Sequence, residues 1–302
     1  MKRNRRCVFW FAALFSLFCT LDGLAQDSIP RVYTSRRGMK SLRQLPQRKT
    51  MKERVALTPV NLPAVFRGLG YNQLTDSVGS LFSVWERLRQ VKAGLSKDTV
   101  RIVHLGDSHI RGHIFPRTTA AKLGEAFGLV SYLDRGVNGA TCLTFTHSDR
   151  IAAIASLKPE LLILSFGTNE SHNRNYQANV HYQQMEEFVR LLQVHLPGVP
   201  ILLTTPPGSY ESFRQRRRQR KFFINPRTEQ AVRTINRYAA THQLAVWDLY
   251  NVVGGRLHAC RNWTSARLMR PDQVHYTSQG YVLQGELLYE AILKAYTDYV
   301  SH

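Results

Sequence analysis

The stretch VRIVHLGDSHIRGH, residues 100–113, decides the fold class. Residues 100–105 are mostly β-branched and apolar, a composition typical of a buried strand. The glycine, aspartate and serine at 106–108 end this strand and begin a turn. The turn has three possible interpretations: a metal site, an activated nucleophile, or a polar loop without chemistry. The surrounding sequence has to separate them.

Similar apolar runs recur along the chain, and helical segments separate them. The predicted strands are 100–105, 129–135, 161–166, 201–205 and 245–250, and the predicted helices are 75–94, 116–127, 180–196, 225–242 and 280–296. This alternation predicts parallel strands joined by right-handed crossovers. We therefore expect an α/β fold: a doubly wound, mainly parallel five-stranded sheet with helices on both faces, in a flavodoxin-like three-layer sandwich. We expect Thr75 to cap the first helix, with Val78 and Phe82 on its apolar face.

The first 25 residues have the pattern of a signal peptide. Four basic residues, Lys2, Arg3, Arg5 and Arg6, precede an apolar run at 7–21, and small residues allow cleavage after Ala25. The apolar run is too short to span a bilayer comfortably, so we expect export without stable membrane insertion once the signal is removed. Residues 26–72 are basic and largely without hydrophobic periodicity, which predicts a partly disordered segment. Residues 73–302 form the predicted globular domain.

The composition limits the classes of partner. The 302 residues are 43% hydrophobic, enough for one sizeable core but not for two large domains. The formal net charge is +20. In an exported protein this charge either favours anionic polymers, rather than nucleic acid, or serves solubility alone. Cys7 and Cys19 leave with the signal peptide, whereas Cys142 and Cys260 remain as a disulfide bridge or as two buried thiols.

A metal site at the turn is disfavoured by its neighbours. His109 and His113 have the four-residue spacing of two zinc ligands on one helix face. However, the segment lacks the glutamate of a zinc-protease motif and contains Arg111 and Gly112 instead. No cluster of carboxylates nearby completes a coordination sphere. We therefore expect no metal at this turn.

A nucleophile needs a base and an acid that orients the base, and both occur near the C-terminus. The segment PDQVHYTSQGY, residues 271–281, contains Asp272 and His275 three positions apart. In a tight turn, the Asp272 carboxylate reaches one ring nitrogen of His275 and leaves the other for Ser108. The alternative is a helix-capping loop with a surface histidine, because this pair of residues alone is common.

Two further segments offer donors for a developing negative charge. Gly139 lies in RGVNGAT, residues 135–141, and Asn169 lies in FGTNE, residues 166–170. The backbone N–H groups of Ser108 and Gly139 and the Asn169 amide would form an oxyanion hole. Taken alone, Gly139 is typical of a plain glycine turn, and Asn169 is typical of a helix cap. All of them follow predicted strands and so fall on the same rim of the sheet, where ligands bind in such folds.

These four blocks, in this order, resemble the SGNH (GDSL-type) hydrolase superfamily over residues 100–302. The segments HLGDSH, GVNGAT, FGTNES, TTPPGSY and DQVHYTSQGY are similar to the peptidoglycan O-acetylesterase branch. The resemblance implies Ser108 as nucleophile, His275 as base and Asp272 as its orienting acid. It implies oxyanion donors at Ser108, Gly139 and Asn169, and neither a metal nor another cofactor.

The rim also carries candidates for substrate binding: His109, Pro207 and Arg217. Arg217 belongs to a basic segment at 214–221, which is either a lip that attracts acidic glycans or a solvated loop. Some members of the resembled branch carry a carbohydrate-binding module between the nucleophile and the glycine block. Here residues 109–138 hold only one helix and one strand, which weakens the assignment to a polymeric substrate.

The resemblance predicts an exported serine esterase that removes O-acetyl groups from a glycan. Its expected substrate is peptidoglycan or another acidic cell-wall polymer, in the periplasm or at the surface of a bacterium. An O-acyltransferase with the same residues, a lipid or aryl esterase, and a wall-binding protein with a vestigial pocket are the alternatives.

Overall fold

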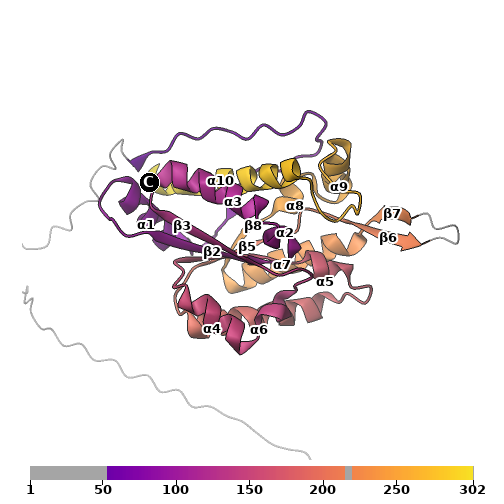
Figure 1. Cartoon of the computed structure of the whole chain (residues 1–302), viewed down its shortest axis with the longest axis horizontal. Helices are drawn as coiled ribbons and strands as arrows, with labels where there is room; N and C mark the ends of the chain where they lie inside the picture. Colours follow the sequence, from indigo (N-terminus) through magenta and orange to yellow (C-terminus); the bar gives the residue numbers. More distant parts are fainter. Residues whose placement is uncertain (1–52, 215–219, 302) are drawn as a thin grey trace, which may run out of the picture. The chain divides into compact units, whose positions relative to one another are not determined.

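The computed structural model describes residues 53–214 and 220–301 (Figure 1). The predicted signal peptide at 1–25, most of the predicted N-terminal segment and Arg217 lie outside the described residues. Among the helices of the described ranges, none combines the length and apolar character needed to cross a membrane.

The predicted parallel sheet is confirmed. Its strands lie in the order β1 (Leu74–Thr75), β8 (Ala245–Trp247), β5 (Ile201–Thr204), β4 (Leu161–Ser165), β2 (Val100–Gly106) and β3 (Val130–Gly136). The last five strands are parallel to one another. The short strand β1 adds an antiparallel edge to β8, which the sequence did not predict.

Helices cover both faces of the sheet, as Figure 1 shows. One face packs against α1 (Phe82–Lys92), α3 (Ile114–Phe127) and α10 (Ser278–Ser301), and the other against α4 (Ser148–Ser156), α6 (Ala178–His195) and α7 (Pro226–His242). Strand β4 shows why the sequence pattern was continuous rather than alternating. Leu161 and Ile163 enter one hydrophobic cluster while Leu162 and Leu164 enter the other, because both faces of a central parallel strand are buried.

Shorter helices complete the fold. They are α2 (Ser108–Arg111), a 3-10 helix (Cys142–Phe145), α5 (Thr168–His172), α8 (Leu249–Val252) and α9 (Gly255–Ser265). Strand β8 is shorter than predicted, because the Asp248 side chain accepts a hydrogen bond from Asn251 N and so begins α8. A run of apolar residues therefore contains both a strand and a helix.

The predicted start of the first helix was wrong. Thr75 belongs to β1, and the Asp76 carboxylate accepts hydrogen bonds from Ser80 N (2.8 Å) and Leu81 N (3.0 Å), which forms a turn before α1 begins at Phe82. Val78 and Phe82 are 52% and 58% exposed, so neither is in the core.

Residues 53–72 pack along the domain, and Figure 1 shows this segment running beside α10. Phe66 is buried with its ring 5.3 Å from that of Trp263. Asn72 accepts a hydrogen bond from Trp247 Nε1 (2.9 Å) and donates one to Glu290 Oε2 (2.8 Å). The segment is thus joined to β8, the strand next to the sheet edge, and to α10.

Two short strands flank the basic segment after β5. Strands β6 (Tyr210–Arg214) and β7 (Arg220–Ile224) pair in an antiparallel arrangement outside the main sheet. In Figure 1 this hairpin projects from the body of the domain. Residues 215–219 lie outside the described residues.

Candidate active site

The fold brings Ser108, His275 and Asp272 together. Ser108 Oγ lies 2.8 Å from His275 Nε2, and His275 Nδ1 lies 2.9 Å from Asp272 Oδ2. Because the ionised carboxylate can only accept, Nδ1 carries the ring proton and donates it. Nε2 is then left to accept from the Ser108 hydroxyl, which is the arrangement that a general base requires.

The loop that carries His275 is fixed by backbone contacts. The Asp272 carboxylate also accepts from Val274 N and His275 N, both at 2.9 Å, so one side chain closes the turn and orients the ring. Arg270 N donates to His275 O (2.8 Å) on the other side of the turn. The neighbouring Tyr276 is buried, and its hydroxyl donates to Gly208 O (2.6 Å).

These contacts set the charge of Asp272. Partial burial alone would raise the pKa of this carboxyl, but the hydrogen bonds from His275 N, Val274 N and the His275 ring outweigh burial and hold the pKa below its ordinary value. Asp272 therefore remains a carboxylate throughout the neutral range, and it can stabilise an imidazolium at His275.

Ser108 is placed by close packing where β2 ends. A Cβ at Gly106 would lie 2.4 Å from Ile110 Cγ1 and 2.7 Å from Ser165 O. A Cβ at Gly136, in the adjacent strand, would lie 2.1 Å from Arg111 N. Only glycine fits at either position, so α2 and its first residue, Ser108, sit directly on the ends of β2 and β3.

The predicted oxyanion donors lie in segments that are tied to Ser108. Val137 N donates to Gly106 O (3.0 Å), which holds the turn containing Gly139 beside the end of β2. Gly139 is exposed and has φ +73°, a left-handed conformation that favours glycine. Asn169 Nδ2 donates to Ala140 O (2.9 Å) and, at the longer distance of 3.4 Å, to Asp107 Oδ2. The Asn169 amide thus links the glycine turn to the residue that precedes Ser108.

Asp107 is a buried carboxyl next to Ser108. Burial raises its pKa to about 7, while the hydrogen bond from His109 N and the charge of His275 act in the opposite direction. Its Oδ1 accepts from His109 N at 2.8 Å, which caps α2. Neutral pH therefore falls within the titration range of this carboxyl.

The three predicted substrate-binding residues have different surroundings. His109 is only 5% exposed, and its Nδ1 lies 3.0 Å from the Tyr281 hydroxyl, with its ring 5.4 Å from that of His275. Burial lowers the pKa of His109 to about 3, so the ring is neutral. Pro207 is buried, and its carbonyl accepts from Trp263 Nε1 (3.1 Å). Arg217 lies outside the described residues.

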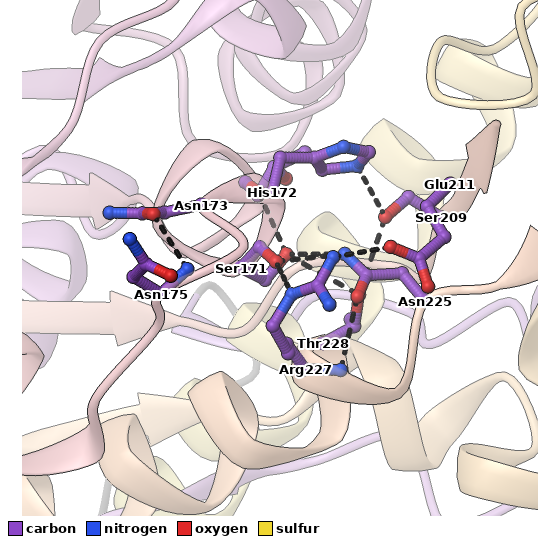
Figure 2. Close-up of polar contacts among 10 residues, drawn as sticks. Ser171, His172, Asn173, Asn175, Ser209, Glu211, Asn225, Arg227 and Thr228 are labelled. Carbon is purple, nitrogen blue, oxygen red and sulfur yellow. Dashed lines mark hydrogen bonds and ion pairs between the residues drawn. The ribbon is translucent and has the colours of Figure 1, made fainter. Parts of the chain in front are cut away.

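The hairpin is fastened to the helix that carries Asn169, as Figure 2 shows. His172 Nε2 lies 3.0 Å from Ser209 Oγ, and Arg227 Nε donates to Ser171 O (2.9 Å). Arg227 also pairs with Glu211 of β6 (2.5 Å). The sequence did not single out these contacts, because polar residues of this kind match no catalytic motif. They place the base of the hairpin beside α5.

Cys142 and Cys260 are separate buried thiols, so the structure resolves the alternatives that the sequence left open. Burial raises the pKa of Cys260 to about 12, which keeps this thiol protonated. Neither cysteine contributes a disulfide to the stability of the domain.

The model of the GDSL-like lipase/acylhydrolase family matches residues 104–283. A solved peptidoglycan O-acetylesterase is similar, with a TM-score of 0.65 and 17% identity over 74% of this chain and 99% of its own. A carbohydrate acetylesterase from Sinorhizobium meliloti has a TM-score of 0.49 and 13% identity over 65% of this chain and 100% of its own. No curated protein matches the chain.

At 17% identity, the similarity to the solved peptidoglycan O-acetylesterase shows the fold alone, whereas the family match extends over more than half of the chain. The matched range includes Ser108, Gly139, Asn169, Asp272 and His275. The chain therefore belongs to the GDSL-like lipase/acylhydrolase family and is a carboxylic ester hydrolase of the SGNH type.

Proposed function

We propose that this protein is an exported bacterial esterase that removes O-acetyl groups from a glycan, with peptidoglycan as the expected substrate. The observation that carries the proposal is the continuous hydrogen-bond path from Ser108 Oγ through His275 to Asp272. These hydrogen bonds connect an activated hydroxyl, a base and a carboxylate directly to one another. The position of this path at the carboxyl end of β2 leaves it on the rim where substrates bind in parallel sheets.

The reaction follows from these positions. Ser108 Oγ attacks the acetyl carbonyl while His275 Nε2 takes the hydroxyl proton, and the resulting imidazolium pairs with Asp272. The tetrahedral oxyanion is stabilised by N–H groups of Ser108 and Gly139, and by the Asn169 amide when its Nδ2 exchanges the long contact with Asp107 Oδ2 for the oxyanion. Collapse breaks the ester C–O bond, and His275 returns the proton to the sugar oxygen. Water, deprotonated by His275, then attacks the acetyl-serine. The second intermediate collapses to acetate, and His275 returns the proton to Ser108 Oγ.

A cell-wall substrate is supported by charge and by comparison. The base of the β6–β7 hairpin is anchored beside α5, and Arg220 and Lys221 of β7 are exposed, so their charge would attract the carboxylates of wall polymers. The similar solved structure is a peptidoglycan O-acetylesterase. The basic, apolar and small-residue pattern of the first 25 residues supports export to the periplasm or the cell surface.

The test is acetate release from O-acetylated peptidoglycan. Wild type is compared with Ser108→Ala and His275→Ala, and with the matched surface controls Ser148→Ala and His195→Ala, whose side chains are exposed on α4 and α6. We expect at least about a 1000-fold lower rate for the two site variants and wild-type rates for the controls. Equal acetate release by wild type and Ser108→Ala would refute the proposal.

The same path also suits acetyl transfer to a sugar hydroxyl in place of water. Supplying an acetyl donor together with chitooligosaccharide separates the two reactions. Free acetate without acetylated sugar is the expected result, and acetylated sugar as the main product would identify a transferase.

A further inference from the structure

Three side chains of metal-ligating type meet in the interior, just after the Gly139 turn. Cys142 Sγ, a Glu170 carboxylate oxygen and a His181 ring nitrogen all lie within 4.8 Å of one another, and all three residues are buried. They come from the 3-10 helix, α5 and α6, so the tertiary fold brings them together. The proposed esterase mechanism uses none of them.

The hydrogen bonds around His181 determine which of its nitrogens is free. Thr234 Oγ1 donates to Gln230 O (2.9 Å), and a carbonyl can only accept. Thr234 therefore accepts from the Tyr176 hydroxyl (3.0 Å), and Tyr176 in turn accepts from His181 Nδ1 (3.0 Å). In the neutral ring, this leaves a lone pair on His181 Nε2.

That lone pair is buried and unused. His181 is 2% exposed, and across residues 53–214 and 220–301 its Nε2 has no hydrogen-bond partner. A buried acceptor without a donor costs free energy unless a cation or another ligand satisfies it. In metal-bound histidines of other proteins, the nitrogen that does not bind the metal likewise donates a hydrogen bond, as His181 Nδ1 does here.

Glu170 and Cys142 supply the complementary charge. The Glu170 oxygens accept from Cys142 N (2.9 Å) and Gly167 N (2.8 Å), which fixes the carboxylate while leaving one lone pair on each oxygen. Burial and the neighbouring Glu170 carboxylate raise the pKa of the Cys142 thiol, so a binding cation must displace its proton. The resulting thiolate and the carboxylate together carry two negative charges. One divalent cation neutralises them, which matters because Leu164, Phe166 and Phe188 line the adjoining cavity.

We propose that Cys142, Glu170 and His181 form a zinc-binding site. Sulfur, nitrogen and oxygen ligands together suit Zn²⁺ better than Mg²⁺ or Ca²⁺. A surface pocket of about 240 Å³, lined by Asn169, Glu170 and His181 among other residues, lies next to the three buried ligands. The ion would link the Gly139 turn to α5 and α6. It would thereby fix the position of Asn169, which precedes Glu170 in α5.

The experiment uses the full chain, freed of metal with a chelator, and Co²⁺ as a spectroscopic substitute for Zn²⁺. We expect one Co²⁺ per chain with a thiolate-to-cobalt absorption band. The band should be absent in Cys142→Ser and retained in the matched control Cys260→Ser, whose thiol is equally buried. In His181→Gln, zinc affinity measured by dye competition should fall at least about tenfold. Circular dichroism establishes that each variant is folded.

The proposal is overturned by three outcomes: no stoichiometric metal on wild type, a band that survives Cys142→Ser, or unchanged zinc affinity in His181→Gln. Should Cys142→Ser fail to fold, His181→Gln alone decides the question. Each of these readouts is independent of esterase activity, so the zinc site and the proposed function can fail separately.

Discussion

Replacing Asp272 with asparagine tests how strongly this carboxylate supports His275. The variant keeps an oxygen that can accept from Val274 N and His275 N, but it places an amide opposite His275 Nδ1. That nitrogen must then accept a hydrogen bond from the amide, so the ring proton moves to Nε2, which can no longer accept from Ser108. The charge that stabilises the imidazolium is lost as well.

The size of the effect follows from distance and exposure. At 2.9 Å, two unit charges attract by about 1.4 kcal/mol in water and by about 6 kcal/mol at an effective dielectric constant near 20. The His275 and Asp272 side chains are 32% and 45% exposed, so an intermediate value applies. About 3 kcal/mol corresponds to roughly a 100-fold fall in kcat.

The assay is hydrolysis of 4-nitrophenyl acetate, with kcat and KM measured separately. KM should change little, because Asp272 lies on the side of the ring opposite Ser108. Asp134→Asn is the matched control, since Asp134 also pairs with a histidine, His113 Nδ1, at 2.9 Å. A kcat for Asp272→Asn within about threefold of wild type would refute the reasoning, as would an equal loss in the control.

Three further predictions concern packing and pH, and urea unfolding measures all of them. Gly136→Ala should lower the free energy of unfolding by about 1–3 kcal/mol or more, because the new Cβ meets Arg111 backbone; an unchanged value would contradict the close packing. Leu123→Ala, at a fully buried site, should cost about 2–5 kcal/mol, and a cost below 1 would indicate looser packing. Burial raises the pKa of Asp107 to about 7, so the folded state holds this proton more tightly than the unfolded chain does. The resulting stability is fully present below pH 4 and is lost as the pH rises through 7. Asp107→Asn should remove that decline, of up to about 4 kcal/mol, whereas a parallel pH profile would contradict it.

The sequence predicted the architecture because its central strands are buried on both faces. Continuous apolar runs such as 161–166 have few other interpretations when helical segments alternate with them. The same alternation placed Ser108 and Asn169 on one rim. The contact of Ser108 with His275 could be anticipated only from the order of the motifs, since 167 positions separate the two residues.

Other features depend on contacts that no local pattern shows. The start of α1 is set by the Asp76 carboxylate, and the end of β8 by the Asp248 side chain. Strand β1 has two residues, too few for any periodicity. The convergence of Cys142 and Glu170 has no short spacing motif, because tertiary packing rather than sequence spacing brings their side chains together.

The antiparallel edge formed by β1 has a practical consequence for shortened forms of this protein. A fragment beginning at residue 73 would lack Asn72 and leave the buried Trp247 Nε1–H without its acceptor, at a cost of about 1–3 kcal/mol. Fraying of the two-residue strand would then expose the backbone of β8 as a template for pairing with another molecule. Such a fragment should aggregate during expression, whereas one that starts before Glu53 should remain monodisperse.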